Sequence, residues 1–177
     1  ILAGGTGTRL STLTKSVNKQ LLPIHDKPMI FYPLSIMMLA NIRKILMIVN
    51  PGQINNFKTL LGDGSRYGIN INYKIQDKPR GLPDAFNLGK SFINNENVAL
   101  ILGDNFFYGQ SLTQKLEKAK KHKSGATIFL KEVSTPENYG VAKIRNKKIE
   151  KIIEKPKKFV SRNAITGLYF FDKPWQW

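Results

Sequence analysis

Residues 98–105 read VALILGDN, five consecutive apolar side chains followed by Gly103, Asp104 and Asn105. A short apolar run that ends in turn residues is typical of a strand buried on both faces. Such strands belong mostly to parallel sheets, in which helices cover both faces. The stretch therefore predicts a buried strand at 98–102 with a polar loop at its carboxyl end, in an α/β fold.

Outward from this strand, helical and extended patterns alternate along the first two thirds of the chain. They predict strands at 1–3, 44–49 and 70–76, and helices at 29–40, 53–61, 83–92 and 112–121. This alternation indicates a Rossmann-like, mostly parallel sheet with helices on both faces. The last third predicts strands at 126–133, 141–145, 148–153 and 164–171, with a turn at Asn146-Lys147. We expect a single domain over residues 1–177, with a strand-rich C-terminal part.

The composition excludes several kinds of site. The chain has no cysteine, so disulfides and cysteine-ligated zinc are excluded. It has two histidines, His25 and His122, which argues against a metal site built from several histidines. No apolar run reaches the roughly 20 residues that a membrane-spanning helix needs, so we expect no membrane partner.

The charge balance is strongly basic, with 28 Lys and Arg against 12 Asp and Glu, a formal net charge of +16. A polyanionic partner such as a nucleic acid is one interpretation. The other is a solvated basic surface, because much of the excess falls at 115–123 and 143–158, on a helix and a hairpin. Basic and aromatic residues do not alternate on one strand face, so we expect no nucleic acid partner. A non-catalytic polyanion-binding module stays an alternative.

A glycine-rich loop follows the first predicted strand. Gly4, Gly5 and Gly7 let backbone N–H groups approach a phosphate closely. Arg9 then adds a planar, permanently charged group suited to phosphate oxygens. Leu10 stands where a dinucleotide-binding motif has its third glycine, and no Gly-Lys-Ser/Thr triplet is present, so neither familiar phosphate loop is matched. An ordinary glycine-rich turn is the alternative.

Seven stretches of the sequence share one resemblance, in order from end to end. They are ILAGGTGTRL, NKQLLPIHDKPMI, LGDGSRYGININYKIQ, GDNFFYG, ENYGV, EKP and AITGLYFF. Together they resemble the thymidylyl branch of the sugar-1-phosphate nucleotidyltransferases. The resemblance implies the nucleotide-diphospho-sugar transferase fold and the transfer of deoxythymidylate from dTTP to glucose 1-phosphate, with Mg²⁺. It also implies a cytoplasmic homo-oligomer, a homotetramer, that serves dTDP-rhamnose and cell-surface polysaccharide synthesis. UTP or CTP is the alternative nucleotide.

The resemblance also implies residue roles. Arg9, Lys19 and Asp104 would carry catalysis, with Arg9 on the departing phosphates and Asp104 on the metal. The nucleotide would be bound by Leu2, Ala3, Gly4, Gly5, Thr6, Gly7, Thr8, Arg9, Lys19, Gln20, Gln76 and Gly81. The sugar phosphate would be bound by Asn105, Tyr139, Gly140, Glu154, Lys155 and Ile165.

Each of these roles has a structural alternative. Asp104 could cap a helix, Gln76 could be a rim residue, and Glu154 could belong to an exposed hairpin. The sequence also departs from its resemblance at Pro83 and Asp84, where the usual relatives have Ala and Gln. Relatives continue further at the C-terminus, where a second metal-binding Asp is expected, so we expect the chain to be shortened.

Overall fold

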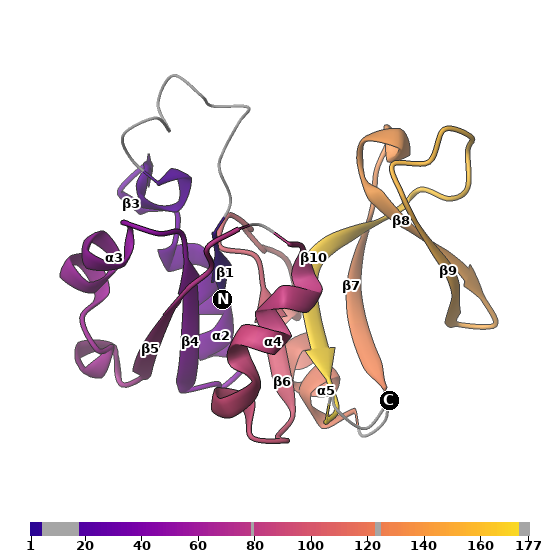
Figure 1. The fold of residues 1–177 in the computed structure, drawn as a ribbon. Coiled ribbons are helices and arrows are strands. Elements are labelled where there is room, and N and C mark those ends of the chain that lie inside the picture. The colour runs from indigo at the N-terminus through magenta and orange to yellow at the C-terminus, as the bar shows by residue number, and fades with distance from the viewer. Residues whose placement is uncertain (5–17, 79, 123–124, 174–177) are drawn as a thin grey trace.

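The computed structural model describes residues 1–4, 18–78, 80–122 and 125–173. Two groups of strands lie side by side, joined along the middle of the molecule (Figure 1). The helices are α2 (Phe31–Leu39), α3 (Ile54–Leu61), α4 (Leu82–Ile93) and α5 (Leu112–Lys121), with short 3₁₀ turns η2 (Lys19–Leu21), η3 (Ser65–Tyr67) and η4 (Pro136–Asn138). The strands are β1 (Leu2–Ala3), β2 (Pro23–Ile24), β3 (Lys27–Pro28), β4 (Lys44–Val49), β5 (Asn70–Ile75), β6 (Val98–Ile101), β7 (Ala126–Glu132), β8 (Gly140–Arg145), β9 (Lys148–Glu154) and β10 (Asn163–Phe171).

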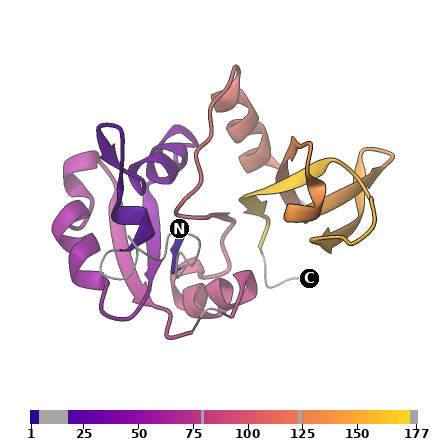
Figure 2. The ribbon, with the colours of Figure 1, turned by 90° about the horizontal axis from the view of Figure 1, so that it is seen from above.

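The first half of the chain builds a parallel sheet in the order β1-β4-β5. A parallel bridge between Leu2 and Leu102 connects β1 to the residue after β6. From β6 onward the pairing is antiparallel, in the order β6-β10-β8-β9 with β7 also on β10. The predicted parallel core and strand-rich C-terminal part are confirmed. The β8–β9 hairpin lies on the side of the molecule opposite to β5 (Figures 1 and 2). Sequence reasoning placed β6 in the parallel sheet alone, whereas β10 returns beside it in the opposite direction.

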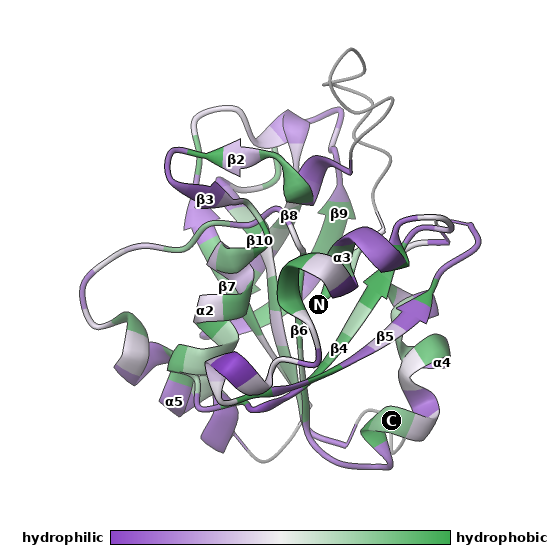
Figure 3. Ribbon diagram, turned by 90° about the vertical axis from the view of Figure 1, so that its left-hand side faces the viewer, coloured by the Kyte–Doolittle hydropathy of each residue, from purple (hydrophilic) through white to green (hydrophobic). Residues whose placement is uncertain are grey.

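Strand β4 is the centre of the parallel sheet and is buried on both faces. Because side chains alternate along a strand, Ile45, Met47 and Val49 join the core that contains α2, α3 and α5. Leu46 and Ile48 join a second core with residues of α4. Figure 3 shows β4 almost wholly in the apolar colour between helices of the two layers. The predicted helices on both faces of the sheet are therefore present.

Turn chemistry sets several element boundaries as predicted. Asn146 and Lys147 have φ of 51° and 60°, as a tight hairpin between β8 and β9 requires. Gly62 ends α3 with φ of 61°, a conformation that glycine adopts without steric cost. The short β2–β3 hairpin was not predicted, because two-residue strands that each contain a proline carry no alternating apolar pattern. No described helix combines the length and apolar character that crossing a bilayer requires.

Phe57 provides a test of the two-layer core. It lies on α3, is fully buried and belongs to the core shared by α2 and β4. Phe57→Ala is expected to lower the free energy of unfolding by about 3–5 kcal/mol, because the buried ring is lost and a cavity is left. Urea denaturation measures the change. Phe159→Ala is the control, since that ring is 74% exposed, and a similar loss in both variants would contradict this core assignment.

Candidate active site

The carboxyl ends of the parallel strands meet at one edge of the sheet and bring together residues far apart in sequence. The Gln76 N–H donates to the Val49 carbonyl at 2.8 Å, which places the end of β5 beside the end of β4. The Gly103 N–H donates to the Leu2 carbonyl at 2.8 Å, which places the end of β6 beside β1. In open α/β sheets this edge is where ligands bind.

Lys19 and Asp104 form an ion pair at this edge, with Nζ and Oδ2 2.8 Å apart. The side chains are 28% and 30% exposed, so both remain accessible to a ligand. Asn18 fixes Lys19 in place: its Oδ1 accepts from the Gln20 N–H at 2.9 Å, and its Nδ2 donates to the Ala3 carbonyl at 3.3 Å. The alternative of a helix cap at Asp104 is wrong, since the next helix along this described stretch, α5, begins only at Leu112.

Gln20 directly follows Lys19 and is 3% exposed. Its Oε1 is buried and has no hydrogen-bond partner in the part of the chain that the structure describes. Its side chain packs against Gly103, where an added Cβ would stand 3.1 Å from Gln20 Cγ and 3.1 Å from Ala3 Cβ. An unpaired buried acceptor costs about 1–3 kcal/mol, so this oxygen is a candidate to pair with a ligand.

Gln76 directly follows β5 and is 4% exposed, so the alternative of a rim residue is wrong. Its Nε2 donates to Asp84 Oδ2 at 2.8 Å. Its Oε1 lies 2.9 Å from the position that a Cβ on Gly4 would occupy. Gly81, with φ of 85°, lies directly before α4 and sets the start of the helix that carries Asp84. The sequence patterns did not predict that Asp84 is the partner of Gln76. The hint in the sequence was that Pro83 and Asp84 stand where the usual relatives have Ala and Gln.

A second group of predicted residues meets on the antiparallel strands. Gly140 and Glu154 are opposite each other in the β8–β9 register. A Cβ on Gly140 would stand 2.7 Å from Glu154 Oε2 and 3.8 Å from Ile165 Cδ1, so the three residues share one small space. The Lys155 N–H donates to the Tyr139 carbonyl at 3.0 Å, which holds these two predicted residues beside the group. The Tyr139 side chain is 45% exposed.

Strand β10 connects the two groups. The Asn105 Nδ2 donates to the Thr166 carbonyl, and the Leu102 N–H donates to the Gly167 carbonyl at 3.1 Å. Ile165 therefore lies on the same strand segment that holds Asn105. Burial, and then the Glu154 carboxylate, raise the pKa of the Tyr169 phenol further along this strand. That phenol stays protonated at neutral pH and keeps its hydrogen-bond donor.

The remaining predicted site residues are only partly described. Ala3 is fully buried beside Gly103 and Leu2 is half-buried, so each acts at this edge through its backbone. Five loop residues lie outside the described residues, namely Gly5, Thr6, Gly7, Thr8 and Arg9.

The oxygen and nitrogen ligands available at this edge suit Mg²⁺ better than zinc. Within the described ranges, no three His, Cys, Asp or Glu side chains gather as a metal site. Asp104 supplies an accessible carboxylate at the strand ends. Mg²⁺ is commonly held by one or two carboxylates together with substrate phosphates, whereas zinc needs more protein ligands. Asp104 therefore suits Mg²⁺ that is bound jointly with phosphate oxygens.

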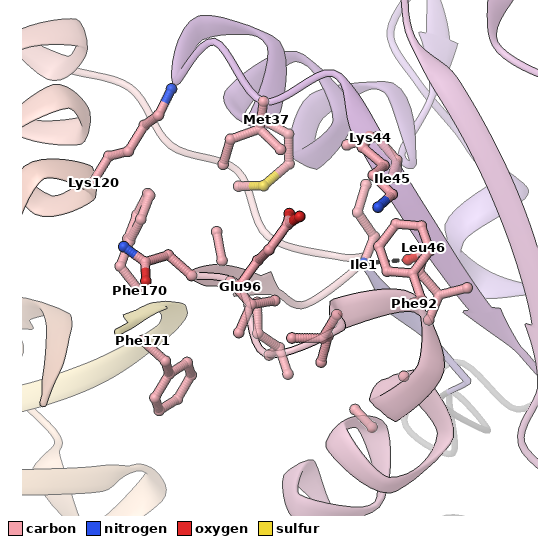
Figure 4. A pocket seen from close by; sticks show the side chains of 18 of the residues that line it. Ile1, Met37, Lys44, Ile45, Leu46, Phe92, Glu96, Lys120, Phe170 and Phe171 are labelled. Carbon is pink, nitrogen blue, oxygen red and sulfur yellow. Dashed lines mark hydrogen bonds between the residues drawn. The ribbon is translucent and has the colours of Figure 1, made fainter. Parts of the chain in front are cut away.

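A cavity of ≈ 380 Å³ lies at the opposite edge of the sheet (Figure 4). It is lined by the first residues of β4 and β6 and by the last residues of β10. Its lining is mainly apolar, and its lysines already have partners: Lys44 lies over the Phe92 ring and Lys120 donates to the Ala40 carbonyl. It does not contain the predicted site residues beyond Leu2, so the strand-end groups are the candidate active site.

A glycine, a cation and a carboxylate at the carboxyl edge of a parallel sheet define a nucleotide-binding α/β protein. The comparisons with known proteins agree with this class. The family model described as Nucleotidyl transferase matches residues 1–175. The chain belongs to this family.

Similar proteins share one name. The chain is 54% identical over 173 residues to a glucose-1-phosphate thymidylyltransferase of Neisseria meningitidis, covering 97% of the chain and 60% of that protein. It is 51% identical to one of Xanthomonas campestris, covering 97% and 59%. The chain thus spans about 60% of the length of the curated relatives it matches.

Solved structures give the same picture of the fold. A Bacillus anthracis protein described as a glucose-1-phosphate thymidylyltransferase, in complex with a sucrose, has a TM-score of 0.90 and 38% identity. The comparison covers 97% of this chain and 70% of that one. A UDP-glucose pyrophosphorylase in complex with UDP-glucose is more distant, with a TM-score of 0.81 and 25% identity over 98% and 74%.

The ion pair between Lys19 and Asp104 gives a test of whether this edge is built for stability. Partly exposed ion pairs contribute about 1 kcal/mol or less. A double-mutant cycle with Lys19→Met and Asp104→Asn is therefore expected to give a coupling free energy of about that size or smaller in urea denaturation. A coupling of several kcal/mol would make the pair a structural element of the fold and would contradict its assignment to a ligand site.

Proposed function

We propose that the protein transfers a deoxythymidylyl group from dTTP to glucose 1-phosphate, giving dTDP-glucose and pyrophosphate. The observation that carries this proposal is the accessible Lys19–Asp104 pair at the carboxyl ends of the parallel strands. It places a cation and a potential metal ligand where nucleotide phosphates bind in such folds. The names of the relatives supply the reaction to be tested.

The nucleotide would lie at the carboxyl ends of β1 and β5. Gly4 offers backbone close to the Gln76 amide, and a Cβ at this position would stand 2.9 Å from Gln76 Oε1. Gln76, Gln20 and Gly81 would bind the base side, and the loop from Gly5 to Arg9 would bind the phosphates. Lys19 supplies a point charge for phosphate oxygens next to the reacting centre.

Asp104 would hold Mg²⁺ jointly with the substrate phosphates. Bound there, the metal would offset the negative charge of the reacting phosphates. Lys19 now pairs with Asp104 at 2.8 Å, and its flexible stem lets the ammonium turn from the carboxylate toward a phosphate when ligands arrive.

The reaction needs no protein nucleophile, because the phosphate of the sugar is already anionic. One of its oxygens attacks the α-phosphorus of dTTP, the bond to the β-phosphate breaks, and pyrophosphate departs from the opposite side. The chain contributes positioning and charge neutralisation. Glu154 accepts hydrogen bonds from sugar hydroxyls, and Gly140 and Ile165 shape the space beside it. Lys155 holds the phosphate of the sugar and Asn105 contacts the sugar, with Tyr139 at the rim.

UTP is the alternative nucleotide, since uracil differs from thymine by one methyl group. The UDP-glucose pyrophosphorylase at 25% identity supports this alternative less than the thymidylyltransferases at 51% and 54% do. Contact with one methyl group changes the selectivity between two substrates by only about 10- to 200-fold. For the complete protein we propose a homo-oligomer, such as a homotetramer, in the cytoplasm, where it supplies dTDP-glucose for dTDP-rhamnose synthesis.

The first test follows pyrophosphate release from glucose 1-phosphate and Mg²⁺ with dTTP, UTP, dCTP or ATP. Release that requires both substrates and is fastest with dTTP is the expected result. The same assay is run on the chain extended to the length of its relatives, of which the present chain spans about 60%. Absence of release from both proteins would overturn the proposed function.

Asp104→Asn tests the metal role. The variant is expected to lose at least about 10²-fold in turnover, because a charge that stabilises the reacting phosphates is no longer held. The Mg²⁺ concentration for half-maximal rate is expected to rise as well. Asp26→Asn is the control, since that carboxylate is 63% exposed on the β2–β3 hairpin. An unchanged Mg²⁺ titration in Asp104→Asn would reject the metal assignment.

A further inference from the structure

We propose that Asp84 is the residue that sets base selectivity, although it would not touch the nucleotide. It holds the Gln76 amide in one orientation, with the carbonyl oxygen facing the nucleotide site. That orientation selects bases that present an N–H there, as thymine and uracil do, and rejects cytosine. The inference rests on the proposed function, because it assigns the base side of that same site.

Asp84 is a buried carboxylate with both oxygens engaged. It lies in the first turn of α4 and is 9% exposed. Its Oδ2 accepts from Gln76 Nε2 at 2.8 Å, and its Oδ1 lies 3.6 Å from Arg80 Nη1. The carboxylate is therefore contacted on two sides, and the shorter of the two contacts is the one to Gln76.

The direction of the Gln76 amide follows from this contact. An ionised carboxylate only accepts hydrogen bonds, so the NH₂ group of the amide must face Asp84. The carbonyl oxygen then points the other way, and it lies 2.9 Å from the position of a Cβ on Gly4. A flipped amide would place two oxygens against each other in a buried site, which carries a large penalty. Asp84 thus leaves Gln76 as a hydrogen-bond acceptor toward the strand-end site.

The acceptor distinguishes pyrimidines by their ring nitrogen. Thymine and uracil carry a hydrogen on N3 and can donate to Gln76 Oε1. Cytosine has a lone pair on N3, so it would place acceptor against acceptor. A mismatch of this kind in a buried site is expected to change selectivity by roughly 5- to 150-fold. The two bases that differ only by the methyl group are not separated by this contact.

A purely structural role for Asp84 makes a different prediction. Acidic residues are favoured in the first turn of a helix by the helix dipole, and an exposed Asp84 would need no other explanation. Loss of a stabilising first-turn charge would weaken the fold and affect all nucleotides alike. Burial of Asp84 and its bond to Gln76 instead predict a change in the ratio between nucleotides.

The experiment compares kcat/KM for dTTP and for dCTP, with saturating glucose 1-phosphate and Mg²⁺, in the wild-type protein and in Asp84→Asn. The asparagine can present either its oxygen or its NH₂ to Gln76, so the amide is no longer held in one orientation. The dTTP/dCTP ratio is expected to fall roughly tenfold or more, mainly through KM. Asp77→Asn is the control, because it removes the same charge one residue after Gln76 from an exposed position.

A swapped pair tests the mechanism without relying on one variant. When Gln76→Glu is combined with Asp84→Asn, the donor and the acceptor exchange places. The amide of the new residue at position 84 donates to the new carboxylate at position 76, whose other oxygen faces the base as an acceptor. The ratio is expected to recover toward the wild-type value in the double variant. Both changes keep side-chain size, and thermal unfolding of each variant confirms that the fold is retained.

The outcomes separate the two proposals. Absence of turnover with any triphosphate in both the chain and its extended form, or a preference for dCTP, would overturn the proposed function and the inference with it. A wild-type protein that preferred dTTP, combined with an unchanged dTTP/dCTP ratio in Asp84→Asn, would overturn the role of Asp84 alone. A fall of the ratio in the Asp77→Asn control equal to that in Asp84→Asn would also overturn it, since charge alone would then explain the effect.

Discussion

Burial of β4 on both faces is the constraint on which the rest of the structure depends. Its side chains from Ile45 to Val49 all contribute to one of two apolar cores, so neither face of β4 holds a polar group between these residues. Its neighbours β1 and β5 satisfy its backbone. Polar groups next to β4 therefore lie at its ends. Helices α2 and α4 follow from the same constraint, because the apolar core on each face of β4 must be shielded from water.

The buried polar side chains show where this constraint was relaxed. Among the described residues they are Asn18, Gln20, Gln76 and Asp84, and all four lie at the carboxyl edge or directly beside it. Burying a polar group is costly unless it is hydrogen-bonded. Asn18, Gln76 and Asp84 satisfy one another or the backbone, whereas Gln20 keeps one unpaired oxygen. A fold that needed only stability would gain from apolar residues here, which agrees with the proposed binding role of this edge.

Local patterns predicted the elements well and their partners poorly. The bounds of β4 and α5 match the prediction at both ends, because apolar periodicity and helix-ending residues are local signals. The antiparallel return of β10 beside β6 depends on pairs such as Leu168 with Ile101, which no local pattern encodes. The site follows the same rule. The resemblance named Lys19, Asp104 and Gln76. It did not predict that Lys19 pairs with Asp104, 85 residues away, or Gln76 with Asp84, 8 residues away, because these contacts depend on how the strand ends and the start of α4 pack.

The bulge in β10 positions the two groups of candidate site residues relative to each other. Its pairing with β7 shifts register between Ile165 and Tyr169, and Gly167 within the shift has φ of 76°. A bulge bends a strand and re-aims the side chains beside it. Here a Cβ at Gly167 would stand 2.5 Å from Asn105 Nδ2, so only glycine leaves room for that side chain. The same irregularity thus positions Asn105 after β6 and Ile165 beside Glu154. The residues proposed for the nucleotide side and those proposed for the sugar side are thus set relative to each other at Gly167.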